Sequence, residues 1–507
     1  MNLKTAFAPY FKVGVAMSRW NIHTKAHCEL MKEQFSSFTA ENDMKPMYYL
    51  DDEACKKDPA KYDLAPALKF DNAIPYLELA KATGVAMRGH TLVWHNQTPK
   101  WFFYRNYNEN AGLATRKTML ARLESYIQGV LNFVQTNYPG IIYAWDVVNE
   151  AIDDEDFRQS LWLRTVGRDF VEKAFTFARK YAAPGVALVY NDYETALDWK
   201  RDLIIEYILE PLKEKGLIDG MGMQSHLLMD HPDFNNYKKA LEMYGALGLQ
   251  IHVTELDMHN ADPSDESMHA LAMRYQELFK ILVEAKKSGK ANVTSVTFWN
   301  LLDENSWLSG FRRETSYPLL FHGKCEPKEA YYKVLETVVD PKDIDVFAPN
   351  YPEEDFQVVG METEHRSFNP MQMVCGFLKD CGTYYLATVD GNKARVRPFG
   401  TAEIIDGKLF MITSKQKDVS KQIQANPNVE ICAYGEGRWL RLAGKLVRDE
   451  RREVKAAMLE AYPNLRGMYS EDDENTELLY FTDATATFSS FGGPSRSFKL
   501  DGEFPQI

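Results

Sequence analysis

The chain has 507 residues, of which 45% are hydrophobic and 26% charged, and its formal net charge is -13. This composition excludes a disordered or collagen-like chain and leaves enough apolar material for at least two cores. The acidic balance argues against a nucleic-acid partner, because phosphate binding needs a concentrated basic surface, and it suits an uncharged ligand.

The sequence has no membrane or export signal that we recognise. No apolar run approaches the roughly 18 residues that span a bilayer, and the first residues lack the apolar stretch of a secretory signal. We therefore expect a cytoplasmic protein with no membrane partner. The six cysteines show no paired spacing, which favours reduced thiols and predicts no metal site: Cys28, Cys55, Cys325, Cys375, Cys381 and Cys432.

From residue 1 to about 340, short apolar runs alternate with longer stretches of helical period. One such stretch, 72–83, lies beside Asp71, has Pro75 in its first turn and ends at Gly84, as helices often do. Eight strands that alternate with helices are typical of a (β/α)8 barrel. The alternative, a doubly wound open sheet, would typically have a Gly-rich phosphate loop, which the sequence lacks. The predicted strands are Phe11–Ala16, Ser37–Ala40, Val85–Gly89, Ile142–Val148, Ala187–Tyr190, Met221–Gln224, Ile251–Thr254 and Thr294–Phe298.

The pattern changes after residue 340. Residues 341–365 contain three prolines and an acidic run and are predicted to be a linker. In 366–507 the apolar period becomes two, which predicts a second, smaller, mostly-β barrel with one helix over 451–461. Its predicted strands are Tyr384–Val389, Ala394–Ile405, Lys408–Thr413, Val429–Tyr434, Trp439–Val447, Leu478–Thr482 and Thr485–Phe491.

Polar side chains follow nearly every predicted strand of the first domain. Function collects at these carboxyl ends in a (β/α)8 barrel. Two of the positions are carboxylates, Glu150 and Glu255, at the fourth and seventh strands, and we expect them on opposite sides of the barrel. The others are Glu41, Asn42, His90, Asn149, Asn191, Gln224, His226, Asp257 and Trp299.

Two carboxylates that face a neutral, hydroxyl-rich ligand suit glycoside hydrolysis. One must be protonated to help the leaving oxygen, and the other must be ionised to attack the anomeric carbon. Mutual repulsion raises the pKa of one member, so a single pair supplies both forms. Indole rings pack on the apolar faces of sugars, and four are candidates for this role: Trp94, Trp101, Trp299 and Trp307.

Six ordered strings of the first domain resemble glycoside hydrolase family 10, the retaining endo-β-1,4-xylanases. The resemblance runs from Lys12 to about Tyr332. The strings are RGHTLVWHNQTPKWF (Arg88–Phe102), WDVVNEA (Trp145–Ala151), YNDYE (Tyr190–Glu194), GMQSH (Gly222–His226), VTELD (Val253–Asp257) and TFWNLLDENSW (Thr297–Trp307).

The resemblance implies a role for each matching residue. Glu150 matches the acid/base and Glu255 the nucleophile. Asn149 would bind a sugar 2-hydroxyl, and His226, oriented by Asp257, would hold the nucleophile. Residues that match substrate-binding positions of the glycone side are Glu41, Asn42, Lys45, His90, Gln224, Trp299 and Trp307.

The sequence departs from the family pattern at two positions. Asn300 stands where the family usually has glycine, and Asp43 where it usually has glutamate. Both departures concern the glycone side, so they bear on substrate length more than on reaction type. The resemblance implies xylan or xylo-oligosaccharide as substrate, and no cofactor for the hydrolase.

Positions 375–494 resemble the pyridoxamine 5′-phosphate oxidase-like flavin-binding split barrels. The resemblance rests on the strings at Thr383–Gly400, Gly407–Cys432 and Trp439–Lys445. It implies that FMN is a possible cofactor of this domain, and that two copies pair through it as a homodimer. Arg397, Thr413, Ser414, Lys417 and Lys421 match the positions that bind the FMN phosphate.

The sequence leaves several hypotheses of function open. The leading one is an endo-xylanase with an attached flavin-type domain of unknown role. A cellulase or a β-xylosidase on the same barrel is a second. A third is an FMN-dependent oxidoreductase whose barrel is vestigial or binds sugar. A protein that only mediates interactions is disfavoured, because binding alone does not require both carboxylates.

Overall fold

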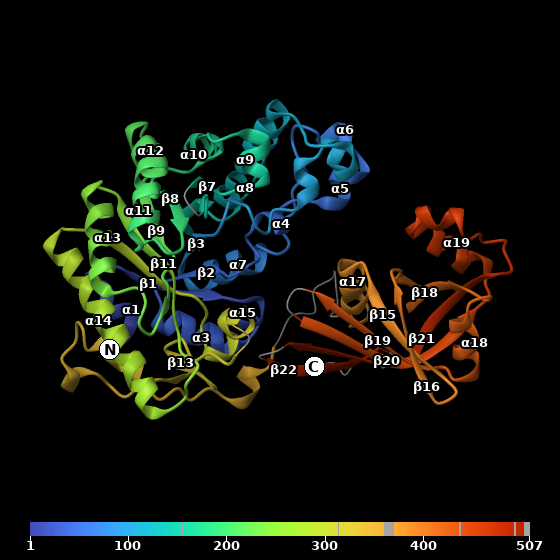
Figure 1. The fold of residues 1–507 in the computed structure, drawn as a ribbon. Coiled ribbons are helices and arrows are strands. Elements are labelled where there is room, and N and C mark those ends of the chain that lie inside the picture. Colours follow the sequence, from blue (N-terminus) through green and yellow to red (C-terminus); the bar gives the residue numbers. More distant parts are fainter. Residues whose placement is uncertain (154–155, 313, 359–369, 436–437, 491–492, 501–507) are drawn as a thin grey trace. The chain divides into compact units, whose positions relative to one another are not determined.

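The computed structural model describes residues 1–153, 156–312, 314–358, 370–435, 438–490 and 493–500. The chain forms two compact units. The first comprises Met1–Trp307 with Ser316–Val359, and the second comprises Leu308–Thr315 with Gly360–Ile507. In Figure 1 the first unit is blue to yellow, and most of the second is orange to red.

The first unit is a closed barrel of eight parallel strands. Each strand pairs with the next around the ring, and β11 closes it by pairing with both β9 and β12. The predicted (β/α)8 fold is therefore confirmed, as are all eight strands. They are β1 (Lys12–Met17), β2 (Ser37–Ala40), β3 (Ala86–Gly89), β5 (Ile142–Asn149), β8 (Ala187–Asp192), β9 (Gly220–Met223), β11 (Gln250–His259) and β12 (Asn292–Phe298).

Helices follow each strand and lie outside the ring (Figure 1). The predicted helix over 72–83 is α7, which begins later, at Ile74, because residues 71–73 form a turn, and its N-cap is Ala73. It ends as expected at Gly84, whose φ of 70° suits glycine. The ring helices are α3 (Lys25–Gln34), α7 (Ile74–Thr83), α8 (Arg116–Asn137), α10 (Phe170–Tyr181), α11 (Asp198–Ile204), α12 (Glu210–Glu214), α13 (Phe234–Ala246), α14 (Asp265–Ser288) and α16 (Glu329–Leu335).

Shorter elements occupy the loops of the first unit, and the two hairpins among them are antiparallel. The helices are α1 (Leu3–Phe7), α2 (Arg19–Ile22), α4 (Pro46–Tyr49), α5 (Asp52–Lys57), α6 (Pro59–Tyr62) and α9 (Leu161–Val166); a further short helix, α15 (Trp307–Arg312), has only its first residue in this unit. The strands are β4 (Val93–Trp94), β6 (Ile152–Asp153), β7 (Asp156–Phe157), β10 (His226–Leu228), β13 (Phe321–His322) and β14 (Glu326–Pro327).

Two glycines of the barrel allow side chains to pack closely beneath its carboxyl end. A Cβ atom at Gly89 would lie 2.2 Å from the ring of Trp145, and one at Gly222 would lie 2.4 Å from Asn191 Oδ1. Both neighbours are buried. The strands therefore need glycine at these positions for reasons of space.

Residues 341–358, in the first part of the predicted linker, pack against the barrel unit. Phe347, Tyr351 and Phe356 are partly buried against its core, and Lys25 Nζ lies 3.0 Å from Asp355 Oδ1. The remaining residues of the predicted linker, 359–365, lie outside the described part of the chain.

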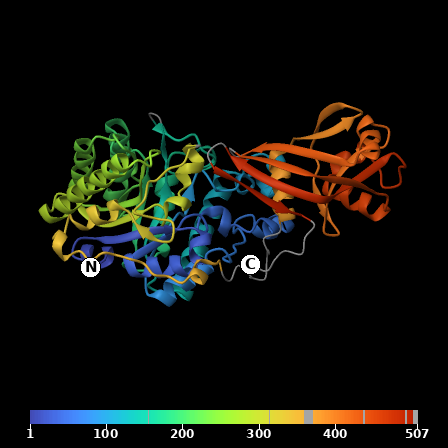
Figure 2. The same cartoon turned by 90° about the horizontal axis from the view of Figure 1, so that it is seen from below.

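The second unit is an antiparallel sheet of eight strands, with the order β16-β15-β19-β20-β21-β18-β17 and β22 paired to β21. Its long strands run side by side in Figure 2. Its elements are α17 (Pro370–Cys381), β15 (Tyr384–Asp390), β16 (Lys393–Phe399), β17 (Glu403–Ile405), β18 (Lys408–Ser414), α18 (Asp418–Ala425), β19 (Asn428–Gly435), β20 (Arg438–Asp449), α19 (Arg452–Ala461), β21 (Thr476–Ser490) and β22 (Gly493–Lys499).

The structure corrects the predicted strands of this unit in two places. The predicted strand 394–405 is interrupted at Gly400, and its halves are β16 and β17. The two strands predicted over 478–491 are one, β21, because the chain bulges at Asp483 (φ 49°) and continues to pair with β20. The last residue of that prediction, Phe491, lies outside the described residues. Sequence analysis missed α17, α18 and β22.

Strand β18 is buried on both faces, which explains its nearly continuous apolar sequence. Leu409 and Met411 face the main core of the unit, and Phe410 and Ile412 pack with Met458 of α19. Across the described part of the whole chain, no helix is both long and apolar enough to cross a membrane.

Candidate active site

The residues predicted for the hydrolase site gather at the carboxyl end of the barrel. They come from strands far apart in the sequence but adjacent in the ring, and hydrogen bonds join many of them. They are Glu41 and Asn42 with Lys45 after β2, His90 after β3, Asn149 and Glu150 at β5, Gln224 after β9, His226 in β10, Glu255 and Asp257 in β11, and Trp299 with Trp307 after β12.

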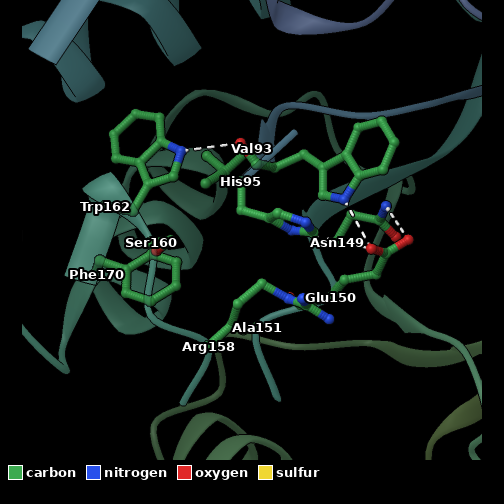
Figure 3. Close-up of a pocket in the computed structure, with 10 residues that line it drawn as sticks. Val93, His95, Asn149, Glu150, Ala151, Arg158, Ser160, Trp162 and Phe170 are labelled. Atoms are coloured by element: carbon green, nitrogen blue, oxygen red, sulfur yellow. Dashed lines mark hydrogen bonds and ion pairs between the residues drawn. The ribbon is translucent and has the colours of Figure 1, made fainter. Parts of the chain in front are cut away.

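The side-chain carboxylate of Glu150 accepts hydrogen bonds only from neutral donors among its described contacts. The Trp94 indole nitrogen lies 3.0 Å from Oε2, and amide nitrogens of Gln224 and Asn149 lie 2.9 and 3.2 Å from Oε1. Figure 3 shows the Glu150 carboxylate beside Asn149, with the ring of His95 nearby. His95 lies 3.9 Å away, and burial lowers its pKa to about 4, so the ring is neutral near pH 7.

Glu255 is bound by a charged donor. His226 Nε2 lies 3.2 Å from Oε2, and His226 Nδ1 lies 2.9 Å from Asp257 Oδ1. Burial opposes protonation of His226, but Asp257 and Glu255 outweigh it and raise its pKa to about 10. Burial also opposes ionisation of Glu255, yet the hydrogen bond from His226 and the influence of His90 lower the pKa of this carboxyl. Glu255 is therefore ionised near neutral pH.

Two asparagine amides connect the carboxylates. Asn191 Nδ2 donates to Glu255 Oε1 at 2.7 Å and to Asn149 Oδ1 at 2.8 Å. Asn149 donates in turn to Glu150. This series of hydrogen bonds fixes the two carboxylates relative to one another. Their remaining partners differ: Glu255 has a cationic partner, and Glu150 has neutral ones.

The residues after β2 form another wall of the site. Lys45 donates to Asn42 Oδ1 at 2.8 Å, and its ammonium group lies 4.9 Å from the centre of a Trp94 ring. Burial lowers the pKa of Lys45. The negative charges of Glu255, Glu41 and Glu150 oppose this effect but do not cancel it. Burial raises the pKa of Glu41. The charges of Glu41, Glu150 and Glu255 therefore all influence the pKa of Lys45.

Two tryptophans after β12 surround His226. The Trp307 ring centre lies 4.9 Å and the Trp299 ring centre 6.5 Å from that of His226. Trp307 Nε1 donates to Asp257 Oδ2 at 2.9 Å. Trp307 therefore helps to orient the carboxylate that holds His226.

Sequence analysis missed a buried charged cluster beneath the site. Arg88 Nε donates to Asp146 Oδ2 at 3.1 Å, and His90 Nδ1 lies 3.0 Å from the same oxygen. Arg88 Nη1 donates to His252 at 2.8 Å. His252 accepts as a neutral ring, because burial and Arg88 lower its pKa. The strings RGH and WDVV contain three of these residues, but nothing within either string indicates that the residues bind one another.

A second group that the sequence analysis missed lies next to Glu150. Arg158 Nε donates to the Glu150 carbonyl at 3.1 Å, Arg158 Nη2 donates to Tyr193 Oη at 2.6 Å, and Arg158 pairs with Asp153 at 2.7 Å. Glu150 itself has φ 57°, and its own N–H donates to Asn191 at 2.9 Å. These contacts hold the backbone of Glu150 in an uncommon conformation.

In the second unit, the five residues predicted to bind a phosphate have different partners. Arg397 donates to Thr388 Oγ1 at 2.5 Å and to Gln422 Oε1 on α18 at 2.6 Å. Thr413 is buried, and its hydroxyl has no protein partner among the described residues. Of the other three, Ser414 accepts from Gln416 N and Lys421 donates to Asp418, both close in sequence, whereas Lys417 donates to the distant Tyr469.

The donor set is chemically suited to a phosphate. Arg397 has only neutral partners among the described residues, and phosphates favour guanidinium and hydroxyl donors. One carboxylate lies near Thr413: Glu477, its register partner on β21, which is paired with Arg448. In the described part of the chain, no group of three or more His, Cys, Asp or Glu side chains is placed to hold a metal ion.

The fold and the site together define a class of protein. A (β/α)8 barrel with one ionised and one neutrally bound carboxylate at its carboxyl end is a glycoside hydrolase scaffold. The chain belongs to glycosyl hydrolase family 10, whose family model matches residues 2–337. Residues 373–486 match the family model of pyridoxamine 5′-phosphate oxidase.

The similar proteins are xylanases. Endo-1,4-beta-xylanase B of Butyrivibrio fibrisolvens is 72% identical over 72% of this chain and 57% of its own length, so the chain spans little more than half of that relative. A solved xylanase of Clostridium thermocellum, complexed with xylohexaose, is 34% identical over 68% of each chain, with a TM-score of 0.62. An intracellular xylanase of Thermoanaerobacterium saccharolyticum, complexed as a mutant with xylotriose, is 35% identical over 66% of this chain and 98% of that one, with a TM-score of 0.58.

Proposed function

We propose that the first unit hydrolyses internal β-1,4 bonds of xylan or xylo-oligosaccharides with retention of anomeric configuration. The observation that supports this most strongly is the asymmetry of the two carboxylates. Glu255 is paired with an imidazolium, whereas Glu150 is bound by neutral amide and indole groups. Such different surroundings suit one carboxylate to attack and the other to donate a proton.

The proposed reaction has two steps. First, Glu150 protonates the glycosidic oxygen as that bond breaks, and Glu255 forms a bond to the anomeric carbon. The ester removes the negative charge of Glu255, so Glu150, now ionised, becomes the base. It takes a proton from water, whose oxygen attacks the anomeric carbon and releases Glu255. Asn149 and Asn191 hold both carboxylates in register throughout.

The other predicted residues are proposed to bind the sugar. Lys45, Asn42 and Gln224 offer donors at the walls of the site, and Trp299 and Trp307 offer flat apolar surfaces beside His226. His90, which Asp146 orients, lies 5.3 Å from the Trp299 ring, measured between ring centres. We propose that Asp257 acts only through His226.

Incubation with xylohexaose tests the proposal. We expect xylobiose and xylotriose as products, with the β-anomer formed first by proton NMR. Glu255→Gln and Glu150→Gln should each abolish turnover of xylohexaose while the exposed control Glu284→Gln stays fully active. Retained turnover in Glu255→Gln, or a first-formed α-anomer, would refute the mechanism.

The substrate class needs a separate comparison, because the barrel alone does not distinguish a xylanase from a cellulase. Initial rates on xylotetraose and cellotetraose decide between them, and release of single xylose units from the chain end would indicate a β-xylosidase. Similarity to an enzyme described as intracellular supports a cytoplasmic enzyme that acts on imported oligosaccharides. Activity in the culture medium rather than in washed cells would contradict that location.

We propose FMN binding as a second function, carried by the second unit. Arg397 is half-buried with neutral partners, and the nearby α18 contributes Gln422. Arg397 would hold the phosphate with Thr413, Ser414, Lys417 and Lys421, and bound FMN would supply redox chemistry. Quenching of flavin fluorescence on titration with the intact chain, lost in Arg397→Met, tests this. The homodimer expected from the sequence stays a prediction, and the molar mass measured by light scattering would test it.

A further inference from the structure

Asn300 has a strained backbone at the carboxyl end of β12. Its φ is 101°, and the residue is only 1% exposed. This region of φ is costly for a residue with a Cβ atom, and glycine adopts it freely. Strained residues of this kind persist where the surrounding structure or the function requires the side chain.

The two ends of the Asn300 amide differ in their partners. Oδ1 accepts from the backbone N–H of Trp307 at 3.4 Å, and Trp307 contacts Asp257 and His226 of the site. Nδ2 is buried and forms no geometrically sound hydrogen bond within the described residues, although it is near enough to Glu41 to lower the pKa of that carboxyl. A buried donor left unpaired costs free energy, so an acceptor from outside the chain would be favourable here.

The side chain that faces this amide is Glu41. Burial raises the pKa of Glu41, and the neighbouring Lys45 and Asn300 partly offset that rise. The pKa of Lys45 is influenced by Glu41 and also by Glu255 and Glu150, so Glu41 lies within electrostatic range of the lysine that also responds to the two carboxylates of the reaction. Asn300 and Glu41 are therefore part of the same site as these two carboxylates.

The pair offers complementary groups for one hydroxyl. A carboxylate only accepts hydrogen bonds, and an amide NH2 only donates them, whereas a sugar hydroxyl does both. One hydroxyl placed between them would donate to Glu41 and accept from Asn300. It would thereby satisfy the buried Nδ2.

We propose that Asn300 is a substrate-binding residue, whose amide donates to a hydroxyl of the second sugar on the glycone side while that hydroxyl donates to Glu41. The inference rests on the proposed hydrolase function and adds a specificity determinant to it. A substrate with two glycone sugars uses Asn300, and a substrate with one does not.

Two variants separate the amide donor from the rest of the side chain. Asn300→Gly removes it and relieves the backbone, so Tm should be unchanged or higher. Asn300→Asp keeps the volume and the acceptor for Trp307 N–H but replaces the donor by an oxygen. The readout is the ratio of kcat/KM on p-nitrophenyl β-xylobioside to kcat/KM on p-nitrophenyl β-xyloside.

We expect this ratio to fall about 5-fold in Asn300→Gly, the effect of one net hydrogen bond. It should fall at least as far in Asn300→Asp. An unchanged ratio in both variants would overturn the proposal. So would a lowered Tm in Asn300→Gly with equal losses on both substrates, because the residue would then be structural. Failure of the proposed hydrolase function is distinguishable, because the unaltered chain would then cleave neither xylohexaose nor the two aryl substrates.

Discussion

Replacement of Asp257 by asparagine should move the pH dependence of hydrolysis. Asp257 is the strongest of the groups that raise the pKa of His226 to about 10. Without its charge, burial dominates and the ring loses its proton well below pH 10. The single amide oxygen of asparagine also cannot replace both carboxylate oxygens, which now bind His226 and Trp307.

The consequence for Glu255 follows from its hydrogen bond with His226. A charged donor stabilises a carboxylate by about 1.5–3 kcal/mol, and one pKa unit corresponds to about 1.4 kcal/mol. Loss of the imidazolium should therefore raise the pKa of Glu255 by about 1–2 units. Because the nucleophile must be ionised, the acidic limb of kcat/KM should shift to higher pH by the same amount.

The measurement is kcat/KM on p-nitrophenyl β-xylobioside from pH 3 to 9. Asp219→Asn is a matched control, because Asp219 also pairs with a cation, Arg179 at 2.7 Å, but precedes β9 at the opposite end of the barrel. Its acidic limb should not move. An acidic limb that stays in place in a folded, active Asp257→Asn variant would refute the assignment of His226 as the cation that holds Glu255.

Two further substitutions test how the barrel supports the site. Gly222→Ala would place a Cβ atom 2.4 Å from Asn191 Oδ1 and displace the amide that joins the carboxylates; we expect kcat to fall by about 100-fold, and an unchanged kcat would contradict this. Asp146→Asn leaves Arg88 as a buried, uncompensated charge, so urea unfolding of the barrel should show a loss of about 3–5 kcal/mol. A loss below about 1 kcal/mol would show that the neighbours of Arg88 compensate.

The barrel was predictable because its signals are local. Each strand of the first unit is a short apolar run, and a parallel sheet with helices outside it needs such runs. The second unit was less predictable. The bulge at Asp483 lets β21 continue through a break in the alternating pattern, so one strand was predicted as two. Its continuity depends on pairing with β20, which the sequence of β21 alone does not contain.

The fold class and the polar residues at the carboxyl ends of the strands were predictable from the amino-acid pattern, because parallel strands bring those ends to one side of a barrel. The family resemblance also implied that His226 holds Glu255 and is oriented by Asp257, but the remaining contacts became known only from the folded chain. Arg88 and His252 are 164 positions apart, and Glu255 meets His226 and Asn191 only when three strands are adjacent. The charge of Glu255 and the unpaired amide of Asn300 depend on burial and on neighbours from distant segments. Those properties arise when the ring closes.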